Sequence, residues 1–164
     1  NYRITQFQAV LLSTQLRRLE DQVRKRDENG RYLSELLSDI PGISPLSRPQ
    51  DATLHPYHLF IFRYDKAAFG NLPKAEFARL LAAEGVPAFM GYPEPLYKQP
   101  VFQRKNFLCY AIPESVDYTK VSCPVAEHAC YEEGVWVLQH AMLGEREDMD
   151  QIAKAIRKIA KRYS

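Results

Sequence analysis

The first forty residues constrain the fold of this chain more than any other stretch. Thr5 followed by Gln8 has the form of a capping box, in which each side chain bonds a free backbone N–H at the start of a helix. Apolar residues then recur at helical spacing until Pro41-Gly42, which stops the pattern. The apolar positions are Phe7, Val10, Leu11, Leu12, Leu16, Leu19, Val23, Leu33, Leu37 and Ile40.

A helix of this length does not fit inside a compact domain. About 35 residues at a rise of about 1.5 Å span roughly 50 Å. A compact chain of 164 residues has a diameter of only about 40 Å. We therefore expect either a bend, for which Asn29-Gly30 is the candidate, or a strut that serves a larger body outside this sequence.

The rest of the chain alternates between strand-like and helix-like patterns. Residues 57–64 are apolar on both faces, which predicts a central strand covered on both sides. Shorter strands are expected at 86–90, 107–112 and 135–138, and helices at 73–85, 125–133 and from 144 to near the end. This order predicts an α+β fold (an α/β sandwich): a small mixed or antiparallel sheet with helices packed on it, led by a long N-terminal helix.

Composition excludes several classes of function. The net charge of +2 gives no reason to expect a nucleic-acid or membrane partner, and no run of eighteen apolar residues predicts a transmembrane helix. Three cysteines, Cys109, Cys123 and Cys130, favour reduced thiols in a cytoplasmic protein. A Cys123–Cys130 disulfide or a metal site that includes His128 are the alternatives, although zinc needs four convergent ligands, and we predict no metal site.

The segment 85–103 is the most unusual in composition. It carries four prolines with aromatic residues between them, which forbids a helix. It is either a surface loop packed by its own aromatic side chains or a rigid wall of a binding site. The chain has no phosphate-binding, nucleophile-elbow or zinc-protease motif, and we predict no catalytic residue within it.

Several motifs, in one order along the chain, resemble the DegT/DnrJ/StrS family of sugar aminotransferases. The resemblance begins with Asn1-Tyr2-Arg3-Ile4-Thr5 followed by Gln8-Ala9 and Gln15-Leu16. It continues with residues 85–97, with Cys123-Pro124-Val125-Ala126-Glu127, and with residues 148–152. These enzymes have the aspartate-aminotransferase fold and use pyridoxal 5'-phosphate (PLP). The resemblance covers essentially the whole chain as the C-terminal portion of such an enzyme, with 1–40 as an interdomain helix and 41–164 as the small C-terminal α/β domain.

The resemblance also implies an activity for the full-length protein. That protein, a homodimer, would move an amino group from glutamate or glutamine to a keto-sugar or keto-cyclitol. Residues 95–103 and the stretch from Trp136 to Gly144 resemble the branch that acts on keto-cyclitols and aminoglycoside-type sugars more than the nucleotide-sugar branch. PLP would be held mainly by an N-terminal domain that supplies the Schiff-base lysine, so this segment alone is expected to be inactive. The alternative is a stand-alone α+β binding module that docks a partner on its long helix.

Site residues follow from the same resemblance. Asn1 is expected to contact the cofactor phosphate, across the dimer interface. Arg3 is expected to face the carboxylate of the amino donor or to support the dimer contact. Tyr92, Tyr97 and Lys98 are the expected acceptor contacts. Tyr97 stands where many family members have histidine, so a proton-transfer role of that histidine does not carry over to this chain.

Overall fold

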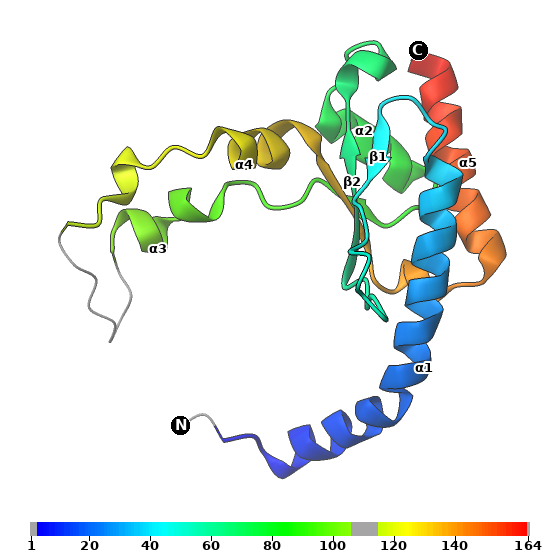
Figure 1. The fold of residues 1–164 in the computed structure, drawn as a ribbon, viewed down its shortest axis with the longest axis vertical. Helices are drawn as coiled ribbons and strands as arrows, with labels where there is room; N and C mark the ends of the chain where they lie inside the picture. Colours follow the sequence, from blue (N-terminus) through cyan, green and yellow to red (C-terminus); the bar gives the residue numbers. More distant parts are fainter. Residues whose placement is uncertain (1–2, 106–114, 164) are drawn as a thin grey trace.

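The computed structural model describes residues 3–105 and 115–163 (Figure 1). The elements run in the order α1 (Gln6–Leu37), β1 (Ile43–Pro45), β2 (Leu59–Tyr64), η1 (Lys66–Phe69), α2 (Lys74–Ala83), β3 (Ala88–Phe89), η2 (Leu96–Lys98), α3 (Pro100–Gln103), η3 (Tyr118–Lys120), α4 (Pro124–His128), η4 (Ala129–Glu133), β4 (Gly134–Leu138), η5 (Ala141–Leu143) and α5 (Arg146–Tyr163). The strand expected at 107–112, together with Asn1 and Cys109, lies outside the described residues.

The long helix α1 forms as predicted, and its capping box is complete. The Thr5 hydroxyl accepts from the backbone N–H of Gln8, and the Gln8 side chain accepts from the backbone N–H of Thr5. The helix is continuous through Asn29-Gly30, the candidate position for a bend. A Cβ on Gly30 would lie 2.4 Å from the Tyr57 ring, so glycine allows close packing here. In Figure 1 the helix bends nearer its N-terminus, outside the sheet domain.

The sheet has four strands in the order β1-β2-β4-β3, and every pairing is antiparallel. Ile61 in β2 lies opposite Trp136 in β4, and Phe62 lies opposite Val135. The small antiparallel sheet therefore confirms the predicted fold class. The edge strand β1 was not predicted, because its three residues, Ile43–Pro45, are too few to show a pattern.

Helices cover one face of the sheet and form the core with it. Phe60, Phe62 and Val137 point toward this layer and are fully or almost fully buried. Their partners come from three helices: Leu33 and Leu37 of α1, Phe77 and Leu81 of α2, and Ile152 and Ile156 of α5. Buried aromatic rings of β2 stack on α2, as in the Tyr64–Phe77 pair with ring centroids 4.3 Å apart. This core explains why helices form near 73–85 and from 144 onward, where the sequence predicted them.

The opposite face of the sheet is open, so the expectation that β2 is covered on both sides is wrong. Ile61 is half-buried and Arg63 is exposed, while their neighbours Phe60, Phe62 and Tyr64 are buried. The side chains on the open face border a cavity instead of a second layer of helices. The predicted helix at 125–133 is also divided, into a short α-helix, α4, and a π-helical turn, η4. Among the helices that the structure describes, none has the length and apolarity needed to cross a membrane.

Candidate functional site

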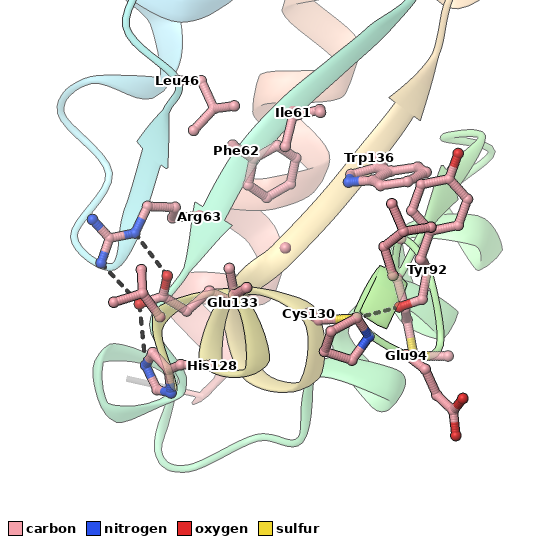
Figure 2. A pocket seen from close by; sticks show the side chains of 18 of the residues that line it. Leu46, Ile61, Phe62, Arg63, Tyr92, Glu94, His128, Cys130, Glu133 and Trp136 are labelled. Carbon is pink, nitrogen blue, oxygen red and sulfur yellow. Dashed lines mark hydrogen bonds and ion pairs between the residues drawn. The ribbon is translucent and has the colours of Figure 1, made fainter. Parts of the chain in front are cut away.

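A cavity of about 770 Å³ lies on the open face of the sheet (Figure 2). Its floor comes from β2 and β4, one wall from the Pro-rich segment after β3, and the other wall from α4 and η4. The Pro-rich segment therefore forms one wall of this cavity. The side chains are mostly apolar: Leu46, Ile61, Met90, Pro95, Leu96, Pro124, Val125, Ala126, Ala129 and Trp136.

Two aromatic side chains form one corner of the cavity. The rings of Tyr92 and Trp136 meet edge to face, with centroids 4.8 Å apart and an interplanar angle of 89°. Gly91 lies directly against the indole: its φ is 78°, and a Cβ there would be 3.1 Å from Trp136 Cε2. The Tyr92 side chain remains 68% exposed, so its surface is available to a ligand. Aromatic corners of this kind suit ring-shaped ligands with apolar faces.

Charged side chains gather at another edge of the cavity. Arg63 donates two hydrogen bonds to Glu133, at 2.9 and 2.8 Å, and His128 Nε2 lies 3.2 Å from the same carboxylate (Figure 2). The Arg63 guanidinium, and to a smaller extent His128, hold the pKa of Glu133 below its ordinary value. Glu133 is therefore a carboxylate held in its charged form, which suits hydrogen-bond acceptance better than proton donation near neutral pH.

Tyr97 and Lys98 lie together, but not in the lining of the cavity. Both side chains bind Glu127: the Tyr97 hydroxyl donates to Oε1, and Lys98 Nζ lies 3.1 Å from Oε2. The backbone N–H of Cys123 donates to the Tyr97 hydroxyl at 3.4 Å. The hydrogen bond with Glu127 raises the pKa of Tyr97 and lowers the pKa of Glu127. These contacts join the Pro-rich segment to the start of α4.

Of the expected site residues that lie within the described ranges, only Tyr92 lines the cavity. Arg3 is exposed at the beginning of the chain and does not line it. Sequence reasoning missed Trp136, Glu133 and Arg63, which line the cavity, and Glu127, which holds Tyr97. The Cys123–Glu127 motif ends in this acidic residue, so the sequence did contain a signal for Glu127. The ion pair between Arg63 and Glu133 spans 70 residues and leaves no local signal in the sequence.

The residues just before α1, together with its first half, present a second exposed surface. We call it the α1 apolar face; its members are Ile4, Phe7, Val10, Leu11, Leu12, Leu16 and Leu19, each at least 45% exposed. A groove of about 430 Å³ continues this face toward Gln139, His140 and Leu143. Buried positions of α1 begin only at Arg26. The α1 apolar face is thus a large surface without a covering partner among the described residues, which is typical of an interface.

The described residues hold neither a metal site nor a site for PLP. No group of three or more His, Cys, Asp or Glu side chains among them could hold a metal ion, and Cys123 and Cys130 are free thiols. A PLP site needs a lysine amine within reach of the cofactor aldehyde, and the described lining of the cavity contains no lysine. The buried amine of Lys74 bonds two backbone carbonyls. The residues present therefore do not fit PLP by themselves.

The chain matches a family model and known aminotransferases over nearly its whole length. The family model described as "DegT/DnrJ/EryC1/StrS aminotransferase family" matches residues 1–157. The chain is 30% identical over 161 residues to the L-glutamine:2-deoxy-scyllo-inosose aminotransferase of Micromonospora echinospora, covering 97% of the chain and 38% of the relative. It is 30% identical over 156 residues to the 3-amino-5-hydroxybenzoate synthase of Amycolatopsis mediterranei, covering 95% of the chain and 38% of the relative.

Solved structures agree with the fold. The crystal structure of 3-amino-5-hydroxybenzoic acid synthase superposes with a TM-score of 0.77 at 24% identity, over 99% of this chain and 40% of that one. The aminotransferase from Psychrobacter cryohalolentis superposes with a TM-score of 0.71 at 25% identity, again over 99% and 40%. The chain thus spans about two fifths of the length of the relatives that it matches.

Proposed function

We infer, from the fact that this chain belongs to the DegT/DnrJ/EryC1/StrS aminotransferase family, that the full-length protein transfers an amino group from L-glutamine or glutamate to a keto-cyclitol or keto-sugar. The observation that carries this proposal is the 30% identity, over 97% of the chain, to an enzyme named as an L-glutamine:2-deoxy-scyllo-inosose aminotransferase. In this proposal residues 1–40 join a cofactor domain to the small C-terminal domain 41–164.

The cavity supports an acceptor with a saturated ring. A cyclitol ring has apolar C–H faces and polar edges, and the site offers both kinds of surface: the Tyr92–Trp136 corner for the faces, and Glu133 at the rim for the hydroxyl groups. We propose Tyr92 as a direct acceptor contact. We propose that Tyr97 and Lys98 act beside Tyr92. Both side chains are held by Glu127 of α4.

The amino-transfer chemistry itself requires groups that the described residues do not supply. We propose that PLP is held mainly by the remainder of the full-length enzyme, with Asn1 reaching the cofactor phosphate and Arg3 near the donor carboxylate or the dimer contact. The homodimer is part of this proposal. The α1 apolar face would then pack against the remainder of the enzyme, and the 164-residue chain alone would be inactive.

The test compares the full-length protein with the isolated chain. Each is incubated with PLP, L-glutamine and either 2-deoxy-scyllo-inosose or a nucleotide-linked keto-sugar, and the amine product is measured by mass spectrometry. We expect amination of the keto-cyclitol by the full-length protein and none by the isolated chain. A full-length protein that binds PLP but aminates neither class of ketone would refute the proposed function.

A further inference from the structure

Lys74 is a buried cation that connects three segments of the chain. It stands at the start of α2 and is only 9% exposed. Its ammonium group donates to the carbonyl of Met90 at 3.1 Å and to the carbonyl of Cys130 at 2.6 Å. Met90 belongs to the wall that follows β3, and Cys130 belongs to the π-helical turn η4. One side chain thus bonds both walls of the cavity described above.

Burial makes this arrangement unfavourable unless the two hydrogen bonds offset it. Moving an ammonium group out of water destabilises its charged form, and burial lowers the pKa of Lys74 accordingly. An apolar side chain of the same length would fill the space without that penalty. What lysine adds is a pair of charge-assisted hydrogen bonds, which are roughly twice as strong as neutral ones.

A second, independent link joins the same two walls. The Cys130 thiol donates to the carbonyl of Tyr92 at 2.9 Å (Figure 2). The carbonyls on both sides of Gly91, those of Met90 and Tyr92, are therefore held by contacts that converge on Cys130. Gly91 lies against Trp136, and the Tyr92 ring contacts that indole edge to face. The link between the walls therefore contacts the backbone on both sides of Gly91, the residue that packs against the indole.

We propose that Lys74 is a positioning residue for the acceptor. By holding the carbonyls of Met90 and Cys130, it fixes the Tyr92–Trp136 corner at the separation from η4 that admits the acceptor ring. This inference rests on the proposed function, because it takes the cavity as the acceptor site. The proposal assigns the corner to the acceptor and not to the amino donor, so loss of the Lys74 cation should weaken acceptor binding selectively.

Steady-state kinetics of the full-length PLP-loaded enzyme test the proposal. Lys74→Met is expected to raise the KM for the keto-cyclitol about tenfold, the size of losing one hydrogen bond from a charged donor. The KM for L-glutamine should stay within about twofold, and Lys74→Arg should recover part of the loss, since a guanidinium can still donate to both carbonyls. Lys154→Met removes an exposed lysine on α5 and serves as the matched control with unchanged kinetics.

A spectroscopic measurement separates positioning from a general loss of stability. The full-length enzyme is labelled with 5-fluorotryptophan, and the ¹⁹F resonance of Trp136 is assigned with Trp136→Phe. Lys74→Met should shift or split that resonance, and Lys154→Met should not. An unchanged acceptor KM with an unchanged resonance overturns the proposal, and so does an equal rise in both KM values. This signal can be read even where no ketone is aminated, so it is independent of the proposed function.

A second variant covers the case in which Lys74→Met does not fold. Cys130→Ala removes only the thiol link to the Tyr92 carbonyl and leaves Lys74 in place. It should raise the acceptor KM in the same direction, by about twofold, because a thiol is a weak donor. A wild-type acceptor KM together with a wild-type ¹⁹F spectrum in this variant would contradict the role given to the wall-to-wall link.

Discussion

Asp27 anchors the loop between β1 and β2 to the middle of α1. Its replacement tests how much this anchor contributes to the free energy of unfolding. The side chain is 3% exposed and accepts from Arg31 and Arg48, each at 2.6 Å. It also accepts from the backbone N–H of His55 at 3.2 Å. Three donors therefore converge on one buried carboxylate. Arg48 in turn donates to the Ala52 carbonyl, which extends the network along the loop.

Asp27→Asn keeps the shape but removes the charge. The amide has one acceptor oxygen for three donors, and its NH₂ group faces a guanidinium. Breaking a fully buried ion pair costs about 3–5 kcal/mol. The side chains of Arg31 and Arg48 are 55% and 19% exposed, so water recovers part of the loss and we expect about 2–3 kcal/mol. With a urea dependence of about 2 kcal/mol per molar, the unfolding midpoint falls by about 1–1.5 M.

The matched control lies on the same helix. Glu20 and Arg24 form an ion pair at 2.6 Å, but their side chains are 74% and 56% exposed. Glu20→Gln should therefore change the free energy of unfolding by less than about 0.5 kcal/mol. Urea unfolding followed by circular dichroism measures both variants. Equal midpoints for Asp27→Asn and Glu20→Gln would refute the assignment of the buried carboxylate as an anchor.

Three further predictions test other parts of the molecule. Leu16→Glu on the α1 apolar face should reduce self-association of the isolated chain in light scattering; a wild-type chain that is monomeric over a wide concentration range contradicts this. Glu127→Gln should lower the pKa of Tyr97, which the carboxylate raises, as seen by ultraviolet titration against Tyr97→Phe. Because the pKa of Tyr97 is raised in the folded state, the Tyr97–Glu127 contact stabilises the fold below the ordinary tyrosine pKa. This contribution is lost as pH rises through the pKa of Tyr97 in the folded state. An unchanged Tyr97 pKa in Glu127→Gln argues against the contact. Gly30→Ala should destabilise the fold by about 1–3 kcal/mol, since its Cβ would meet the Tyr57 ring; an unchanged thermal midpoint would contradict this.

Local signals in the sequence were enough to predict α1 and its start. A capping box involves two residues three positions apart, so Thr5 and Gln8 reveal it without tertiary information. The buried stripe of α5 is equally local, because its spacing repeats along one helix face. The bend was misplaced because Gly30 reads as a helix breaker, whereas here it serves close packing against Tyr57.

The open face of the sheet could not be predicted from the composition of β2. Ile61 is as apolar as the buried Phe60 and Phe62, so the strand reads as buried on both sides. An apolar residue that lines a cavity and one that packs in a core have the same identity in the sequence. The contacts of the site could not be predicted from the sequence for a similar reason. Tyr97 and Glu127 are 30 residues apart in the chain, and only the fold brings them together.

The α1 apolar face and the walls of the cavity both expose apolar side chains to water. In Figure 1 the first half of α1 and the segment that carries α3 and α4 both project from the sheet domain toward the same side. The α1 apolar face and the walls of the cavity lie on these projections, while the helical layer of the sheet domain buries its apolar residues in its own core. Apolar surface concentrated in this way is favourable only when it is removed from water. Since the chain spans about two fifths of the length of its relatives, the remainder of the enzyme is the partner that we propose to cover it, and the cavity with Tyr92 and Trp136 would then face that partner.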